Sequence, residues 1–322
     1  MWMDLFLELT KLMCLLECVT SAPIFETQIK DVQNYLTAFG YLPKASSSRK
    51  SFLLDKSGFV SALRQLQKFA GLEETGVVDD KTLEILKVPR CSLPDIIEHQ
   101  QDYYPKPRKK RYAVQGSRWR KKILSYKVGK YPTGLDKVDV DTDVKRAFKM
   151  WSDASGLTFL NKQLSDDPVD IEIRFENYYH GDEDSFDGPG GEDQTILFIR
   201  IFINLSGHVA HAFFPEFGGD AHFDNKEYWT VNKFTVRSWF FKVDCNVSIL
   251  QGTNLLQSVT HEIGHSLGLQ HFNKTDSMMA PFYKGWDPFM KLSKDDITAV
   301  KELYNDIVSV KEERRWRYFS LG

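Results

Sequence analysis

The stretch His261-Glu262-Ile263-Gly264-His265-Ser266-Leu267-Gly268-Leu269-Gln270-His271 decides which fold and chemistry this chain can have. It reads H-E-x-x-H-x-x-G-x-x-H. His261 and His265 are four residues apart, so on a helix they lie on one face and both rings can reach one metal ion. Gly268 tolerates the positive φ of a sharp turn, which brings His271 round as a third ligand. Three imidazoles leave the fourth position of a tetrahedral zinc ion open for water, as in catalytic sites.

Two neighbouring features support this interpretation. Glu262 directly follows the first ligand, so its carboxylate can face the activated water as a general base. Ser277-Met278-Met279-Ala280-Pro281 has the form of the methionine turn of metzincin proteases, which places Met279 beneath the site. Chance histidines on a helix are the alternative, but three of the chain's eight histidines fall at this one spacing.

The composition is that of an ordinary globular protein. The chain has 322 residues, a net charge of -2 and 42% hydrophobic residues, which suggests about two domains. Nothing in it indicates a nucleic-acid partner, and no apolar run reaches the roughly 18 residues of a membrane span. Residues 1–22 are predicted to be a signal peptide, although Asp4, Glu8 and Lys11 interrupt the apolar run. An ordinary amphipathic helix therefore fits this segment equally well.

A small helical domain with an unusual end precedes the histidine motif. Residues 27–88 favour three helices, with Asp79 as the cap of the third. Pro89-Arg90-Cys91-Ser92-Leu93-Pro94-Asp95 then places one cysteine between two prolines. A lone cysteine in a loop is usually inert. Beside a zinc motif, however, a Cys91 thiolate can fill the open metal position and exclude water.

This segment resembles the P-R-C-G-x-P-D cysteine switch of the matrix metalloproteinases, and the resemblance covers about residues 27–305. It implies an α+β fold, in which a three-helix propeptide precedes a metzincin catalytic domain. That domain would be a twisted mixed β-sheet with helices and the zinc in a cleft. Ser92 stands where the family has glycine. Serine lacks glycine's freedom at positive φ, so latency is expected to be looser.

Arg108-Lys109-Lys110-Arg111 follows the switch. Such a run is most often a solvated loop or a polyanion patch. Its place here suggests cleavage after Arg111 by a furin-like convertase, as in the furin-activated members of the family. The new ammonium at Tyr112 would pair with Asp295-Asp296. The expected regions are a signal peptide (1–22), a propeptide (23–111), a catalytic domain (112–305) and a tail or truncated hinge (306–322), without a hemopexin domain.

Hydrophobic patterns in the catalytic region predict three strands and three helices. We expect strands at 123–128, 169–175 and 209–214, and helices at 140–152, 255–267 and 294–303. Substrate should lie extended along the strand at 209–214, as an added strand would. Ala212, Pro281 and Tyr283 are expected to line the main specificity pocket.

The resemblance also implies further metal sites. A structural zinc would be held by three imidazoles and a carboxylate, which form a closed tetrahedral set: His180, Asp182, His211 and His222. Calcium prefers carboxylates and carbonyl oxygens, and the residues implied are Asp187, Gly188, Gly190, Asp224 and Glu227, and separately Asp170 and Asp220.

Two segments exceed the family pattern, residues 192–207 and residues 234–250. Both are rich in Phe, Ile, Val and Trp, unlike polar loops. They fit either a genuine insertion or a mistaken gene model. The first would loop out between the structural zinc and calcium ligands.

The expected function is that of a secreted zinc endopeptidase made as a zymogen, which cleaves extracellular matrix or other extracellular proteins. Glu262 would take a proton from zinc-activated water and deliver it to the leaving amine. The alternatives are a catalytically impaired scaffold that acts by binding, and a misassembled gene-model product.

Overall fold

The computed structural model describes residues 29–43, 56–97, 114–182, 185–186, 208–231, 252–284 and 287–319, the last twelve by their backbone alone. Several expectations lie outside these residues. They are the signal peptide (1–22), the convertase site at Arg111, the segments 192–207 and 234–250, and the predicted calcium ligands Asp187, Gly188 and Gly190.

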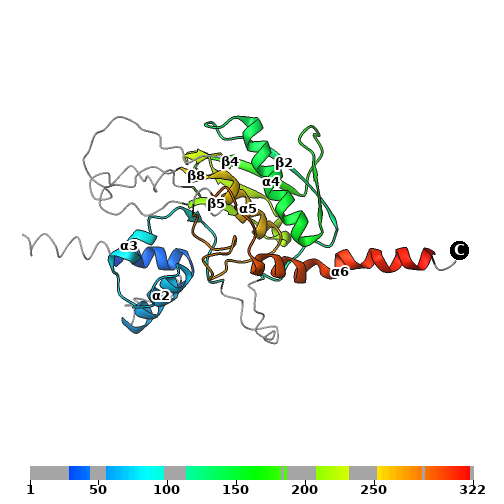
Figure 1. Ribbon diagram of the computed structural model, residues 1–322. Helices are drawn as coiled ribbons and strands as arrows, with labels where there is room; N and C mark the ends of the chain where they lie inside the picture. Colours follow the sequence, from blue (N-terminus) through cyan, green and yellow to red (C-terminus); the bar gives the residue numbers. More distant parts are fainter. Residues whose placement is uncertain are drawn as a thin grey trace, which may run out of the picture.

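The N-terminal region contains three helices, as predicted: residues 29–38, α2 (Lys56–Phe69) and α3 (Asp80–Ile85). The Asp79 carboxylate accepts a hydrogen bond from the backbone N–H of Thr82, so the predicted cap of the third helix is confirmed. The helices share a core of their own, which includes Leu36, Leu63, Leu66 and Leu86. In Figure 1 they lie to one side of the sheet.

A six-stranded sheet of order β1-β5-β6-β4-β2-β3 forms the centre of the remaining chain. Its strands are β1 (Arg90–Cys91), β2 (Ile123–Lys130), β3 (Thr158–Asn161), β4 (Ile171–Glu176), β5 (His208–Ala212) and β6 (Ala221–Asp224). A second pair consists of β7 (Trp229–Thr230) and β8 (Thr253–Asn254). Neighbours in the large sheet are parallel except β5 and β6, which are antiparallel, so the predicted mixed sheet is confirmed.

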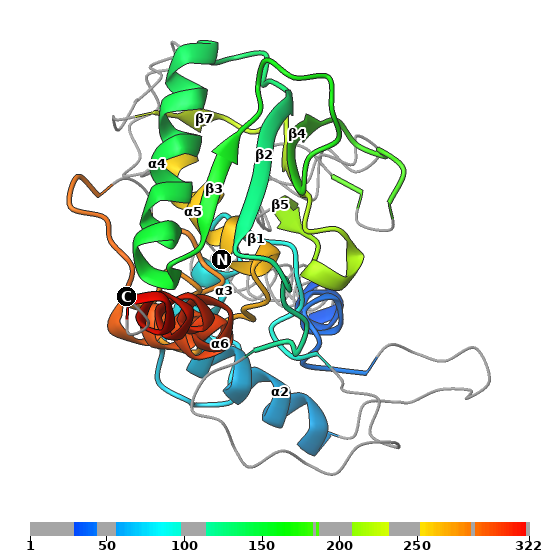
Figure 2. The ribbon, with the colours of Figure 1, turned by 90° about the vertical axis from the view of Figure 1, so that its right-hand side faces the viewer.

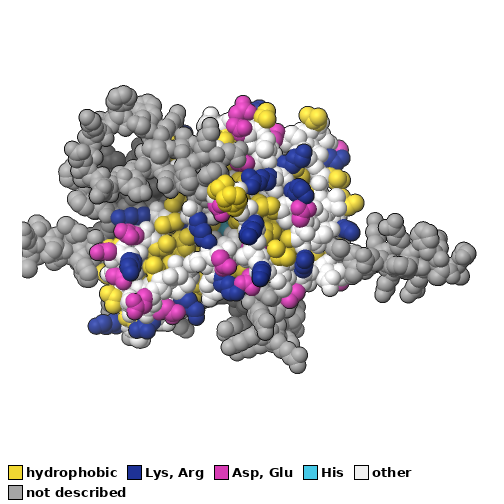
Figure 3. Space-filling model, in the orientation of Figure 1, with side chains coloured by type: hydrophobic (Ala, Val, Ile, Leu, Met, Phe, Trp, Pro, Cys, Tyr) yellow, Lys and Arg dark blue, Asp and Glu magenta, His cyan; other side chains and the backbone are white. Residues whose placement is uncertain are grey.

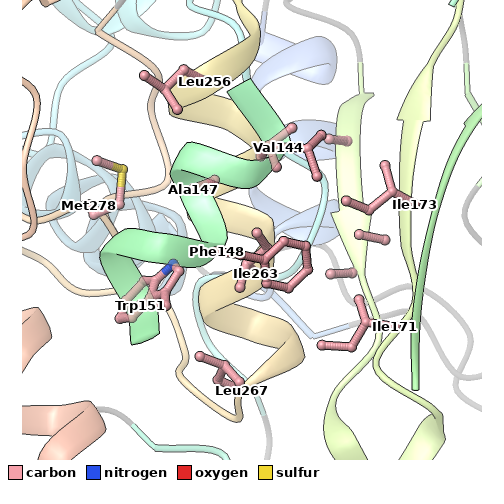
Figure 4. Packing of buried hydrophobic residues seen from close by; sticks show 14 of the residues in the cluster. Val144, Ala147, Phe148, Trp151, Ile171, Ile173, Leu256, Ile263, Leu267 and Met278 are labelled. Carbon is pink, nitrogen blue, oxygen red and sulfur yellow. The ribbon is translucent and has the colours of Figure 1, made fainter. Parts of the chain in front are cut away.

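Two helices pack on this sheet, α4 (Lys137–Ser155) and α5 (Leu255–Ser266). Figure 4 shows Phe148 of α4 between Ile263 of α5 and the isoleucines of β4. The helices are also joined by a buried hydrogen bond of 2.7 Å from the Trp151 indole to the Thr260 carbonyl. The helix that carries the histidines is thus fixed on a packed hydrophobic face.

Predicted and observed elements differ at their ends, as two examples show. The strand predicted at 209–214 is observed at His208–Ala212, and a 3-10 turn at Pro215–Phe217 follows, where the missing N–H of proline is tolerated in the first turn. The helix predicted at 294–303 continues as α6 (Lys294–Phe319). No helix among the described residues combines the length and apolar character needed to cross a membrane.

The sequence did not predict strand β1. It belongs to the cysteine segment and joins the sheet edge parallel to β5, with Cys91 opposite Ala210. In Figure 2, β1 is labelled beside β5. The segment after the N-terminal helices therefore docks by adding a strand to the edge of the sheet.

Candidate metal centres

α5 presents two histidines on one face, and the turn after it supplies the third. Asn254 caps the start of the helix through a hydrogen bond of 3.0 Å from the Gln257 backbone. The helix ends at Ser266, and Gly268 then takes φ 96°. A side chain at that position would also collide with the Ser117 carbonyl, so glycine is required twice over.

The three imidazoles converge as the motif predicts. The Nε2 atom of His261 lies 3.1 Å from that of His265 and 3.2 Å from that of His271. The Sγ atom of Cys91 lies 3.6 Å from Nε2 of His265, and all four side chains are buried. Three nitrogens and a sulfur that face one another at these distances fit a tetrahedral zinc ion with the cysteine at its fourth position.

The Nδ1 atoms of His261 and His265 are held by backbone carbonyls of residues that follow them in the chain. Nδ1 of His261 donates to the Met278 carbonyl at 2.7 Å, and Nδ1 of His265 donates to the Leu269 carbonyl at 2.7 Å. These bonds leave both Nε2 atoms unprotonated and free to bind a metal.

Met279, predicted to form the floor of the site, packs against the helix that carries the first two histidines. Its thioether packs against Gly264 on α5, where a larger residue would collide with it. The turn is held by the buried Asp296, which accepts hydrogen bonds from Ser277 Oγ at 2.5 Å and from the Met278 backbone at 2.8 Å. The sequence singled out Asp296 only as a possible partner of a new N-terminus.

Glu262 is fully buried beside the cluster. Its Oε1 accepts a hydrogen bond of 2.7 Å from the Tyr283 hydroxyl, while Oε2 has no hydrogen-bond partner among the described residues. Burial raises the pKa of this carboxyl to about 8, against the opposing effect of the tyrosine hydrogen bond. Tyr283, expected as a pocket wall, therefore also contacts the predicted base.

The cysteine segment, residues 89–95, lies beside β5, where substrate was expected to bind. Its backbone bonds to both sides: Ser92 N–H donates to the Ala210 carbonyl at 2.8 Å, and Cys91 N–H donates to the Pro281 carbonyl at 3.2 Å. Tyr283 N–H donates in turn to the Pro89 carbonyl at 2.9 Å. Access to the strand edge is therefore closed in this state.

Ser92 is not strained, contrary to the expectation from glycine at this position. Among described residues other than glycine, only Tyr178 has a positive φ. The Ser92 hydroxyl is instead buried without a described hydrogen-bond partner. Such a group costs about 1–3 kcal/mol, so looser docking is still expected but for a different reason.

A buried charge network supports the segment, and only part of it was visible in the sequence. Arg90 pairs with Asp95 at 2.5 Å and donates to the Tyr35 hydroxyl at 2.9 Å, while the Tyr41 hydroxyl donates to Asp95. The guanidinium also lies over the ring of Phe39. Arg90 and Asp95 are in the quoted switch sequence, but nothing local linked them to the aromatic residues of the first helix and of the turn that follows it.

A second cluster comes together on β5, β6 and the preceding loop. Oδ2 of Asp182 lies 2.9 Å from His180 Nε2, 3.0 Å from His211 Nε2 and 2.9 Å from His222 Nδ1. His211 and His222 are direct partners in the antiparallel register. Burial and the neighbouring His211 lower the pKa of His222 to about 4, which keeps it neutral. Three imidazoles around one carboxylate fit the closed zinc site that was expected.

The described calcium candidates are engaged in protein contacts. Asp170 pairs with Lys121 and accepts from the Ser125 backbone at 2.8 Å. Asp220 accepts from the Glu172 backbone at 2.7 Å. Asp224 is buried at the end of β6 and accepts from the Lys226 backbone at 2.8 Å.

A mixed sheet backed by two helices thus carries a buried cluster of three histidines, with a cysteine from the N-terminal part of the chain docked against it. The family model described as matrixin matches residues 118–305, and one described as a putative peptidoglycan binding domain matches residues 26–86. The chain belongs to the matrixin family.

Its relatives differ in length. Matrilysin of Rattus norvegicus is 35% identical over 92% of this chain and 96% of its own length. Hatching enzyme of Paracentrotus lividus and matrix metalloproteinase-15 of Homo sapiens are each 34% identical, over 89% and 91% of this chain respectively. The chain spans only 40% of the length of either of these two proteins.

Proposed function

We propose that this chain is the zymogen of a secreted zinc endopeptidase that cleaves extracellular proteins. The observation that carries the proposal is the buried convergence of three histidines and Cys91 directly beside Glu262. The first four would hold zinc in the latent form, and removal of Cys91 would leave one metal position for water.

A zinc ion held by His261, His265 and His271 supplies Lewis acidity to water and to the peptide carbonyl. The work of this chain's own residues is proton transfer. A carboxylate oxygen of Glu262 takes the proton of the attacking water and then delivers it to the nitrogen of the leaving amine. The Tyr283 hydrogen bond fixes the rotamer of that carboxylate in the latent form.

Substrate would replace the cysteine segment between β5 and residues 281–283. Departure of the propeptide frees the carbonyls of Ala210 and Pro281 and the N–H of Tyr283, which are backbone groups suited to an extended peptide. Ala212, Pro281 and Tyr283 are the proposed lining of the specificity pocket at this strip.

Activation would follow cleavage after Arg111 by a furin-like convertase, which separates a propeptide (23–111) from a catalytic domain (112–305). Because Asp296 is committed to the methionine turn, Asp295 is the proposed partner of the new ammonium at Tyr112. Asp295 pairs with the half-exposed Lys274 in the latent form. The ammonium of Tyr112 would thus take the place of Lys274 beside Asp295.

Further metals would stabilise the catalytic domain. We assign a structural zinc to His180, Asp182, His211 and His222, whose geometry supports it. We also propose calcium sites, because the family resemblance implies them and calcium prefers carboxylate and carbonyl oxygens. Their ligands would be Asp170, Asp220, Asp224, Glu227, Asp187, Gly188 and Gly190.

The test is peptide hydrolysis by the full chain before and after treatment with a furin-like convertase. We expect a product that begins at Tyr112 and cleaves a quenched peptide. A chelator should abolish the activity and added zinc should restore it. A cleaved, zinc-loaded product that hydrolyses neither a panel of quenched peptides nor denatured collagen would instead support a binding scaffold.

A further inference from the structure

The third zinc ligand differs from the other two in its support. His261 and His265 each donate their outer nitrogen to a backbone carbonyl of the domain that carries them. Nδ1 of His271 instead lies 2.7 Å from Oδ1 of Asp95, and both side chains are fully buried. The group beside the outer nitrogen of this ring is therefore a carboxylate of the propeptide, at ion-pair distance.

We propose that Asp95 strengthens the catalytic zinc site through His271, so that the latent protein holds its metal more tightly than the mature enzyme does. This inference rests on the proposed zinc site. A carboxylate that accepts the outer N–H of a ligating histidine fixes the ring and makes its other nitrogen a stronger donor. Cleavage after Arg111 would remove that carboxylate from the catalytic chain.

Asp95 is held firmly enough for this role. Arg90 binds the same oxygen, Oδ1, at 2.5 Å, and the Tyr41 hydroxyl donates to Oδ2. The guanidinium also balances the carboxylate charge, which would otherwise be costly in a buried site. Cζ of Arg90 in turn lies 3.5 Å from the ring centroid of Phe39, in the turn after the first helix, so this part of the propeptide also supports the guanidinium.

Asp95 and Cys91 would act on the metal by different routes. Cys91 presents its sulfur to the same centre as the three Nε2 atoms. Asp95 lies on the far side of the His271 ring and contacts Nδ1 alone. Its effect should therefore persist when the sulfur is removed, and the Cys91→Ser zymogen separates the two contributions.

The experiment measures the zinc dissociation constant of the uncleaved protein by competition with a chromogenic chelator, in the Cys91→Ser background. Asp95→Asn should raise the dissociation constant of the catalytic zinc by about 10–100-fold. The matched control is Tyr41→Phe, which removes the hydroxyl that donates to Oδ2 of Asp95 and keeps the carboxylate at His271. Equal affinities of Asp95→Asn and its parent, or an equal loss in Tyr41→Phe, would overturn the proposal.

A second measurement needs no variant that must fold. In zinc-loaded, isotope-labelled zymogen with wild-type Asp95, the Nδ1 proton of His271 should give a deshielded, exchange-protected NMR resonance. It should disappear after convertase cleavage and propeptide removal, while those of His261 and His265 remain. A His271 resonance that is unprotected in the zymogen, or unchanged in the mature enzyme, contradicts the role of Asp95.

Elemental analysis before either measurement separates this inference from the proposed function. Purified protein without zinc would count against the endopeptidase itself. Zinc-loaded protein whose affinity ignores Asp95 would overturn the present inference alone.

Discussion

The two histidine clusters differ in where their ligands come from. The catalytic cluster takes three ligands from α5 and its following turn, and the fourth from the propeptide. The second cluster takes all four from one stretch of the catalytic domain, on β5, β6 and the loop before them. The first can be opened by removing a segment, whereas the second is closed by the fold itself.

The two clusters also differ in how far their side chains are exposed to solvent. Every member of the catalytic cluster is buried in this latent state, while three of the four members of the second cluster are partly exposed. Histidine side chains are almost absent from the face drawn in Figure 3. A site that must meet substrate is thus the better covered of the two, because the propeptide fills it until cleavage.

The largest expected effect is that of Glu262→Gln on the activated enzyme. The amide cannot take up the proton, so turnover of a quenched peptide should fall by at least about 10²–10⁴-fold. Both clusters should keep their zinc, because this side chain contributes no ligand to either. Near-normal turnover at full zinc content would remove Glu262 from the mechanism.

Next in size is the gain expected from Cys91→Ala in the uncleaved protein. Loss of the sulfur opens the fourth position of the catalytic cluster alone, so peptide hydrolysis should appear without a convertase. Wild-type zymogen treated in parallel is the control. Equal rates for the two proteins would show that the clusters do not differ in the way described.

His222→Ala should act on the other cluster and mainly on stability. Loss of one of four ligands weakens metal binding, and the binding energy of a structural zinc is folding energy. We expect one zinc fewer per chain and a clearly lower melting temperature in the zymogen. A variant that retains two zinc ions and its melting temperature would refute the assignment of a structural site.

The smallest effect tests a buried acid with no metal role. Asp143 on α4 is 1% exposed, its Oδ2 has no described hydrogen-bond partner, and burial raises its pKa to about 6. Arg146 opposes this shift and Asp139 adds to it. Because the folded pKa exceeds the unfolded value of about 3.9, this group's contribution to stability is fully present at low pH. It is lost as the pH rises through about 6.

Asp143→Asn should therefore stabilise the protein at pH 8 by about 1–2 kcal/mol and change little at pH 4. The measurement is the difference in melting temperature between variant and parent at the two pH values, with zinc present throughout. An equal difference in melting temperature at both pH values would show that the shape of the side chain, and not its charge, determines the effect of the substitution.

The convergence of the three histidines could be predicted from local sequence because they lie close together in it. The four-residue spacing of His261 and His265 becomes a shared face as soon as the segment is helical, and the glycine at the helix end accounts for the turn to His271. The element types of β2, β4, α4 and α5 were predicted from periodicity for the same reason, with ends displaced by a few residues.

The second cluster needed more than periodicity. A lone histidine in a strand carries no local sign of a metal, so His180, His211 and His222 were expected through the resemblance to a family. The antiparallel register of β5 and β6 is what places His211 opposite His222. That pairing joins residues distant in sequence and is decided by the whole sheet.

By itself, the sequence determined which helix carries the zinc ligands, which glutamate accompanies them and which cysteine can block them. These are consequences of covalent spacing and side-chain chemistry. Only the tertiary structure decided that the cysteine segment becomes a sheet strand, that Tyr283 binds Glu262 and that Asp95 reaches His271. Cys91 and His265 are 174 residues apart, and no local pattern encodes such a contact. It exists because two separately folded surfaces bury each other's apolar and charged groups.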